Sequence, residues 1–263
     1  MTFIKSFSIN TDRQQPFPFN IPAVRFARNV QLDEKVTIFV GDNGCGKSTL
    51  LESIAYQLDV PLIGGRIEES DSFAAVKLLK PSLEIEWKRE TGKGFFFRAE
   101  DFSAFINGLD REKAKIMMSL HELKGQVDES VIEKMSDSMR FYLREMIKKY
   151  GSDMRVFSHG EAYLTILQIQ LQGKGIYLLD EPEAALSPLK QLSLMAIILE
   201  VLKTRNAQFI IATHSPILMG IPGATLYEIQ ENGMVQVEYK ETDHYQITKR
   251  FLDNPESYVR HLR

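Results

Sequence analysis

A glycine-rich stretch near the N-terminus has the residue types and the spacing of a phosphate-binding loop. It reads Gly41-Asp42-Asn43-Gly44-Cys45-Gly46-Lys47-Ser48-Thr49, which fits the pattern G-x-x-x-x-G-K-S. Its glycines allow backbone N–H groups to converge on phosphate oxygens in conformations that a Cβ atom would obstruct. We expect Lys47 to reach the β and γ phosphates and the Ser48 hydroxyl to ligate Mg²⁺. These nine residues therefore predict a binding site for a nucleoside triphosphate.

Three polar side chains further along the chain follow two apolar runs. Asp180 and Glu181 end the first run and His214 follows the second, and open α/β sheets place ligands at the carboxyl ends of such strands. Asp180 can hold Mg²⁺, directly or through water. Glu181 can orient or deprotonate the water that attacks a γ-phosphate, and His214 can donate to that phosphate. Together with Lys47, Glu181 and His214 form the predicted catalytic set.

A helix start lies between the loop and these residues. Ser158-His159-Gly160-Glu161 is a capping box, in which the serine accepts from a helix N–H and the glutamate reaches back. The helix is expected to run to about Gln172. A capping box by itself is an ordinary helix start. Any functional role for it depends on its place among the other predicted sites.

Regular elements must position these residues. Val36–Val40 is a β-rich run before the loop, and Leu50–Leu58 is apolar at helical spacing after it. Ile176–Leu179 and Phe209–Ala212 are predicted to be short buried strands. Pro188 is expected to start a helix through Leu202. Each predicted site therefore lies at the end of a strand or at the start of a helix.

Other runs predict additional strands. Phe3–Ile9 alternates apolar and polar residues and is typical of an opening strand. Leu83–Trp87 and Gly94–Phe97 are predicted to pair as a β-hairpin. Tyr227–Val237 predicts a second hairpin, turned by Asn232-Gly233.

Prolines at 16, 18 and 22 predict an extended loop ahead of the glycine stretch. It carries Arg25 and Phe26, close enough in sequence to flank a bound nucleotide. The aromatic ring could stack on the base, and the arginine could approach phosphate. A core aromatic and a solvated arginine are the alternative interpretation.

From about residue 101 to 156 the pattern changes to helical. An apolar stripe there is expected to pack against the core, with a partner groove as the alternative. The end of this segment is basic, so it is either a solvated face or a DNA contact. Its cations are Arg140, Arg144, Lys148, Lys149 and Arg155. The tail from Thr242 is expected to form two short helices separated by Pro255.

Bulk properties describe a globular chain of 263 residues, 44% apolar and 25% charged. The net charge of −3 gives no overall attraction to nucleic acid or anionic membrane. No apolar run approaches twenty residues, which leads us to expect a cytoplasmic protein without a membrane segment. The single cysteine, Cys45, is expected either to be reactive in its N–H-rich loop or to be a small residue tolerated there.

The order of these sites resembles the ABC-type ATPase family. The loop fits the family's Walker A form, Leu178-Leu179-Asp180-Glu181-Pro182 looks like Walker B with its catalytic glutamate, and Ala212-Thr213-His214-Ser215 looks like the switch-histidine motif. Ala184-Ala185-Leu186-Ser187 resembles the D-loop. The resemblance implies an α/β P-loop fold with a mostly parallel central sheet, an antiparallel β subdomain and a helical insertion. The terse motifs are similar to those of the non-transporter branch, which includes SMC, RecF and OLD-type ATPases.

The resemblance also implies a domain plan and a partner. One domain spans 1–263, with Walker A and antiparallel strands in 1–100, the insertion in 101–157, and the signature, Walker B and switch histidine in 158–263. Ser158 and Gly160 stand at the signature position, where the family contacts the γ-phosphate bound to the other subunit. His159 and Glu161 depart from the usual signature residues. A head-to-tail homodimer with two ATP molecules is implied.

No clear counterpart of the family's Q-loop glutamine is present, and Glu100 is the proposed substitute. The leading hypothesis is Mg²⁺-dependent ATP hydrolysis coupled to dimerisation, in DNA maintenance or defence. One alternative is the nucleotide-binding subunit of an ABC transporter. Another is a slow-hydrolysing, nucleotide-gated clamp on DNA, and an unidentified protein partner also stays open.

Overall fold

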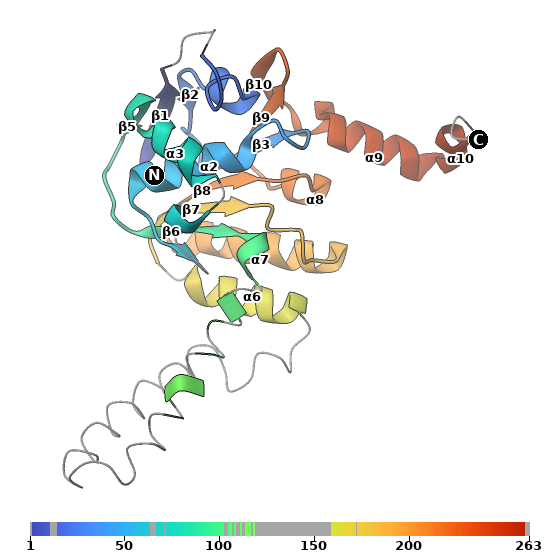
Figure 1. The fold of residues 1–263 in the computed structure, drawn as a ribbon. Helices are drawn as coiled ribbons and strands as arrows, with labels where there is room; N and C mark the ends of the chain where they lie inside the picture. Colours follow the sequence, from blue (N-terminus) through green and yellow to red (C-terminus); the bar gives the residue numbers. More distant parts are fainter. Residues whose placement is uncertain are drawn as a thin grey trace, which may run out of the picture.

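The computed structural model of the chain describes residues 2–10, 15–63, 67–70, 72–102, 159–171 and 173–260, with a few positions between 105 and 118. Seven strands form the central sheet in the order β10-β9-β3-β8-β7-β6-β4 (Figure 1). Every neighbouring pair is parallel except β9 and β10. Its strands are β3 (Val36–Gly41), β4 (Leu62–Ile63), β6 (Gly94–Arg98), β7 (Gly175–Asp180), β8 (Ala207–Ala212), β9 (Thr225–Gln230) and β10 (Gly233–Val237). The predicted mostly parallel α/β sheet is confirmed.

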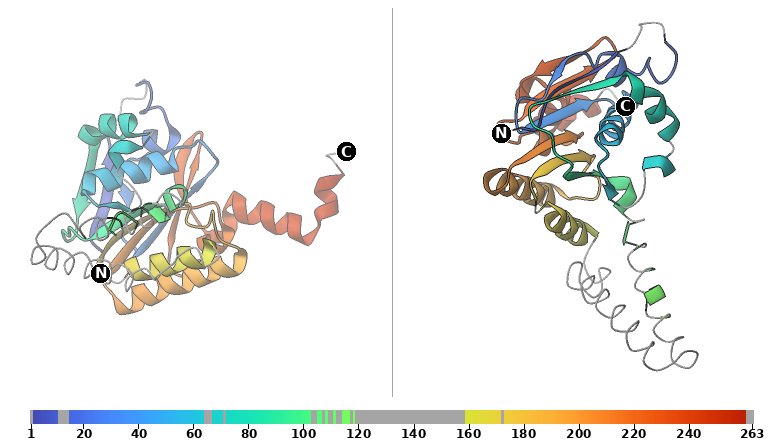
Figure 2. Two further views of the ribbon diagram at one scale, coloured as in Figure 1. Left: turned by 60° about the horizontal axis from the view of Figure 1, so that its bottom comes forward. Right: turned by 90° about the vertical axis from the view of Figure 1, so that its left-hand side faces the viewer.

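Two hydrophobic cores lie on the two faces of this sheet. Successive side chains of a strand point to opposite faces, so Phe39 packs in one core while Ile38 and Val40 pack in the other. Helices α2 (Lys47–Leu58) and α3 (Phe73–Leu79) cover the first face, and α6 (His159–Gln170) and α7 (Pro188–Thr204) cover the second (Figure 2). Burial on both faces explains why the strand sequences are continuously apolar.

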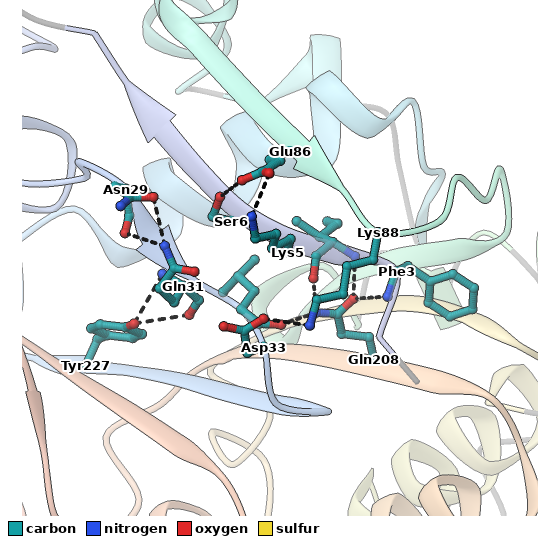
Figure 3. Close-up of polar contacts among 12 residues, drawn as sticks. Phe3, Lys5, Ser6, Asn29, Gln31, Asp33, Glu86, Lys88, Gln208 and Tyr227 are labelled. Atoms are coloured by element: carbon teal, nitrogen blue, oxygen red, sulfur yellow. Dashed lines mark hydrogen bonds and ion pairs between the residues drawn. The ribbon is translucent and has the colours of Figure 1, made fainter.

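An antiparallel sheet of three strands packs beside the central one. In it, β1 (Ile4–Ile9) lies between β2 (Val30–Gln31) and β5 (Leu83–Trp87). Gln208 of β8 joins the two sheets, because its buried amide accepts from the N–H groups of Phe3 and Ile4 at 2.8 Å. The same side chain donates to the carbonyls of Ile4 and Leu32, at 3.0 and 2.9 Å (Figure 3).

The predicted hairpin of Leu83–Trp87 with Gly94–Phe97 is wrong. β5 pairs with β1, whereas β6 lies between β4 and β7 in the parallel sheet. Phe95, Phe96 and Phe97 are all buried, which is typical of a strand covered on both faces rather than of a hairpin with one solvated face.

The C-terminal region begins with the predicted hairpin of β9 and β10, which is confirmed, although Gly233 is already the first residue of β10. Two helices follow, α9 (Asp243–Asp253) and α10 (Pro255–Val259), divided at Pro255 as expected. They extend away from the body of the molecule (Figures 1 and 2). Most of the predicted insertion, including its basic end, lies outside the described residues.

Candidate functional site

The glycine loop joins β3 to α2 in the conformation that the sequence predicts. Gly46, at φ +96°, immediately precedes α2, and Gly41 ends β3 at φ +151°. A Cβ atom on Gly46 would lie 2.1 Å from Cγ2 of Ile21, and one on Gly41 would lie 2.5 Å from the carbonyl oxygen of Ile229. Both positions therefore require glycine, for backbone conformation and for space.

Lys47 lies over this loop. Its ammonium Nζ donates to the carbonyl oxygens of Gly41 and Asp42, at 2.9 and 3.0 Å. Nζ is also 3.8 Å from Sγ of Cys45. Cys45 is only 8% exposed, which favours the interpretation as a small residue fitted into a tight loop. The buried ammonium supplies the positive charge that an anion bound to the loop requires.

Asp180 and Ser48 form a pair at the start of α2 and the end of β7. Burial raises the pKa of the Asp180 carboxyl from 3.8 to about 7, although a hydrogen bond from Ser48 opposes this shift. Oδ1 of Asp180 is buried without a hydrogen-bond partner. A buried carboxylate oxygen without a donor, next to a hydroxyl, fits a Mg²⁺ ion that takes its other ligands from water and phosphate. No cluster of three potential metal ligands occurs among the described residues.

Glu181 and His214 come together from neighbouring strand ends. Register aligns Asp180 with Ala212, and the Glu181 N–H donates to the Ala212 carbonyl at 2.9 Å. Oε1 of Glu181 then lies 3.6 Å from Nε2 of His214. Glu181 has φ +46°, a strained conformation for a residue with a side chain. Its side chain remains 45% exposed, so it can meet water and a substrate phosphate.

Glu183 is a residue of the site that the sequence motifs did not single out. Its Oε1 accepts from the backbone N–H of His214 at 2.6 Å. Burial raises its pKa. The carboxyl thus ties the loop after β7 to the segment after β8. The only sequence signal was its place two residues beyond Glu181.

Arg25 and Phe26 lie beside the glycine loop. Residues Pro22–Arg25 form a short helix, α1, in place of the predicted extended loop. The Ala23 N–H donates to the Cys45 carbonyl at 2.9 Å, which ties α1 to the loop. The Arg25 guanidinium lies 5.3 Å from the centre of the Phe26 ring, and its Nε is buried without a partner. The proposed contact with nucleotide stays a prediction.

Glu100 lies beyond the end of β6, in a 3₁₀ turn (Ala99–Asp101). Its carboxylate is 3.4 Å from Arg98 and 74% exposed. Arg98 is register partner of Asp180 and pairs with buried Glu52 and with Asp101. No sequence motif marks this buried ion pair next to Asp180. The role of Glu100 stays a prediction.

Of the signature residues, Gly160 lies in the first turn of α6, which begins at His159. Ser158 lies outside the described residues. The predicted helix is confirmed and ends at Gln170. The roles of Ser158 and Gly160 stay predictions.

A family model described as an AAA domain matches residues 18–172, more than half of the chain. A second AAA domain model, whose description refers to the AbiEii toxin of a type IV toxin–antitoxin system, matches residues 126–220. Both spans share residues 126–172.

Curated relatives include ATP-binding proteins of import systems and of a lipoprotein-releasing system. The phosphate import ATP-binding protein PstB of Thermotoga maritima is 27% identical over 69% of this chain and 70% of its own length. The aliphatic sulfonates import ATP-binding protein SsuB of Bacillus subtilis is 27% identical over 66% of this chain. The match covers 60% of SsuB, less than two thirds of that relative.

Among solved structures, the Smc head domain of Pyrococcus furiosus with bound ScpA C-terminal domain is similar in fold. Its TM-score is 0.50 at 12% identity, over 95% of this chain and 99% of that chain. Within the part of the chain that the structure describes, no helix is long and apolar enough to cross a membrane.

Proposed function

Because this chain belongs to the AAA domain family of ATPases, we propose that it hydrolyses ATP with Mg²⁺ in sites that two copies of the chain complete together. The family and the ATP-binding relatives support ATP hydrolysis as the activity. The observation that best supports this catalytic site is the distance of 3.6 Å between Glu181 Oε1 and His214 Nε2. Those two residues end neighbouring strands, β7 and β8, and β8 in turn pairs with β3, which carries the glycine loop.

Each residue has a role that follows from its position. Lys47, now bonded to two loop carbonyls, supplies positive charge to the β and γ phosphates. Glu181 accepts the proton of the attacking water, because its carboxylate is exposed where strand ends converge. His214 donates from Nε2 to a γ-phosphate oxygen. Arg25 and Phe26 would flank the bound nucleotide.

Asp180 and Ser48 would hold Mg²⁺, which neutralises charge on the phosphates when bound. Ser48 is close enough to Asp180 to oppose the rise in the pKa of that carboxyl. Glu52 and Arg98, a buried pair, contribute opposing charges next to Asp180. Glu100 forms an ion pair with Arg98 at 3.4 Å. As the proposed substitute for the Q-loop glutamine, it would link the Mg²⁺ site to the segment after β6.

A second copy of the chain would cover the loop, which is open in a single chain. Asp42, Asn43 and Gly44 are exposed, and a closed site that expels bulk water strengthens the electrostatic contacts to the phosphates. Ser158 and Gly160 at the start of α6 would contact the γ-phosphate held by the partner copy. Helix N-termini present free N–H groups to phosphate.

Mixing two inactive variants tests the composite site. Glu181→Gln and Gly160→Trp would each inactivate both sites of their own homodimer. In a mixed dimer, one site contains the intact Glu181 of one chain and the intact Gly160 of the other. An equimolar mixture should recover up to about a quarter of the wild-type rate, because at most about half of the dimers are mixed and each has one intact site. No recovery would contradict composite sites, whereas an inactive wild type would contradict ATP hydrolysis itself.

A transporter subunit is the second candidate, because the curated relatives PstB and SsuB are import ATP-binding proteins. It predicts that the chain co-purifies with a membrane protein. We favour a non-transporter ATPase, because the short Walker B and switch-histidine motifs are similar to those of the non-transporter branch. ATPase rates with and without duplex DNA, over a salt series, would identify a DNA-linked role, since binding to phosphates weakens steeply with salt.

A further inference from the structure

A hydrogen bond joins His214 to a second histidine, which no sequence motif marks. Nδ1 of His214 and Nε2 of His244 are 3.0 Å apart, and the ring centroids are 5.2 Å apart. His214 follows β8, whereas His244 lies in the first turn of the C-terminal helix α9. The nitrogen of His214 that faces Glu181 is the other one, Nε2.

Two buried polar residues hold the first turn of α9, and one of them lies in the central sheet. Thr242 is fully buried, and its hydroxyl accepts from the Tyr245 N–H at 3.3 Å and donates to the Tyr239 carbonyl at 2.9 Å. Glu228 of β9 is buried and accepts from the Asp243 N–H at 3.1 Å. The position of His244 is therefore set by the body of the protein. The rest of α9 extends outward (Figure 1).

The bond between the rings decides which nitrogen of His214 carries a proton. In a neutral pair, only one ring can donate across it. Donation from His214 Nδ1 would leave Nε2 of the same ring without a proton, so Nε2 could only accept. Donation from His244 Nε2 instead requires the proton of neutral His214 to lie on Nε2, toward Glu181.

The surroundings favour neutral rings. Burial lowers the pKa of His214 and of His244, and the nearby Lys47 charge lowers both further. Glu181 and Asp42 act in the opposite direction on His214, as Asp42, Glu228 and Asp243 do on His244. A neutral His214 can still donate to a phosphate, provided that it is the Nε2–H tautomer.

We propose that His244 is a positioning residue: its Nε2–H donates to His214 Nδ1 and thereby fixes His214 as the tautomer that donates from Nε2. This inference rests on the proposed role of His214 in the ATPase site. The position of α9 therefore matters to the site, because displacement of that helix removes the His244 donor from His214. In other functional histidines, too, a hydrogen bond to one ring nitrogen determines the protonation and the role of the other nitrogen.

The tautomers can be read directly in the wild-type protein. Long-range ¹H–¹⁵N spectra at pH 7.5 report which ring nitrogens are protonated, and spectra of His214→Gln and His244→Gln assign the two rings. We expect both rings as Nε2–H tautomers. A proton on Nδ1 of His214 would overturn the proposal, and this result does not depend on ATPase activity.

Kinetics provide the second test. His244→Leu removes the donor and should lower kcat by about 10- to 100-fold. This is the range for loss of the group that hydrogen-bonds the second ring nitrogen of a functional histidine. His244→Gln, whose amide N–H can donate to Nδ1, should retain most of the activity. Thr248→Leu, on the exposed part of the same helix, is the matched control and should leave kcat unchanged.

A double mutant separates positioning from general destabilisation. If His244 acts only through His214, then His214→Ala with His244→Leu should be no slower than His214→Ala alone. Losses that multiply would overturn the proposal. Should His244→Leu fail to fold, the wild-type spectrum and the His244→Gln rate still decide. An inactive wild type would refute the proposed function and leave the spectroscopic result standing.

Discussion

Glu183 Oε1 accepts a hydrogen bond from the backbone N–H of His214 at 2.6 Å. This contact joins the ends of β7 and β8 and holds the two residues, Glu181 and His214, whose side chains approach each other at 3.6 Å. The geometry of the proposed catalytic pair therefore depends on a third, buried carboxyl.

Replacing Glu183 tests this dependence. Glu183→Ala should lower the free energy of unfolding by about 1–3 kcal/mol, because the partly buried His214 N–H loses its acceptor. It should also lower kcat, since His214 is no longer held. Glu183→Gln keeps an acceptor oxygen and should cost less in both respects. Urea unfolding and ATPase rates measure the two effects, and equal behaviour of the two variants would contradict the role of the oxygen.

Asp180 makes the stability of the protein depend on pH in the absence of nucleotide and Mg²⁺. The carboxyl ionises near 3.8 in the unfolded chain and at about 7 in the folded one. The unfolded chain thus releases its proton first, so this group's contribution to stability falls as pH rises from 3.8 to 7. The loss is on the order of 4 kcal/mol.

Asp180→Asn removes that titration. Without Mg²⁺, the variant should therefore be more stable than wild type at pH 8 and should lose the advantage at acidic pH. Chemical unfolding at pH 5 and pH 8 measures both. If the difference between the two proteins stays constant with pH, the raised pKa is wrong.

Gly46→Ala tests the backbone of the loop. The new Cβ would meet Cγ2 of Ile21 at 2.1 Å and would hold alanine at φ +96°. A strained conformation of this kind costs on the order of 1–3 kcal/mol, and the displaced loop should no longer bind nucleotide. Gly233→Ala, where no atom lies within 4 Å of the new Cβ, is the control. Calorimetric titration with ATP should show binding for the control alone.

The strands at the centre of the fold could be predicted because they are apolar on both faces. Val36–Val40 and Phe209–Ala212 are each within two residues of the observed strands. Partner choice could not be predicted, since alternation in Leu83–Trp87 does not reveal that it pairs with Ile4–Ile9. Local pattern specifies which face of a strand is buried, but not its neighbour.

Within the site, the residues that carry motifs were identifiable, and those that only support them were not. The glycine loop and the Asp180-Glu181 pair stand at fixed positions relative to strands. His244 reaches His214 from a helix 30 positions away, through a chain path that folds back along β9 and β10. Contacts of that kind depend on tertiary packing, which no short pattern encodes.

In the proposed mechanism, ATP joins two copies of the chain, and Glu181 activates water in the site that forms between them. Size-exclusion chromatography and ATPase assays of wild type and Glu181→Gln, with ATP and Mg²⁺, test it most directly. Glu181→Gln should still bind ATP, turn over about 10²- to 10⁴-fold more slowly than wild type, and accumulate as a dimer only when ATP is present. Turnover equal to that of wild type, with no ATP-dependent dimer, would contradict it.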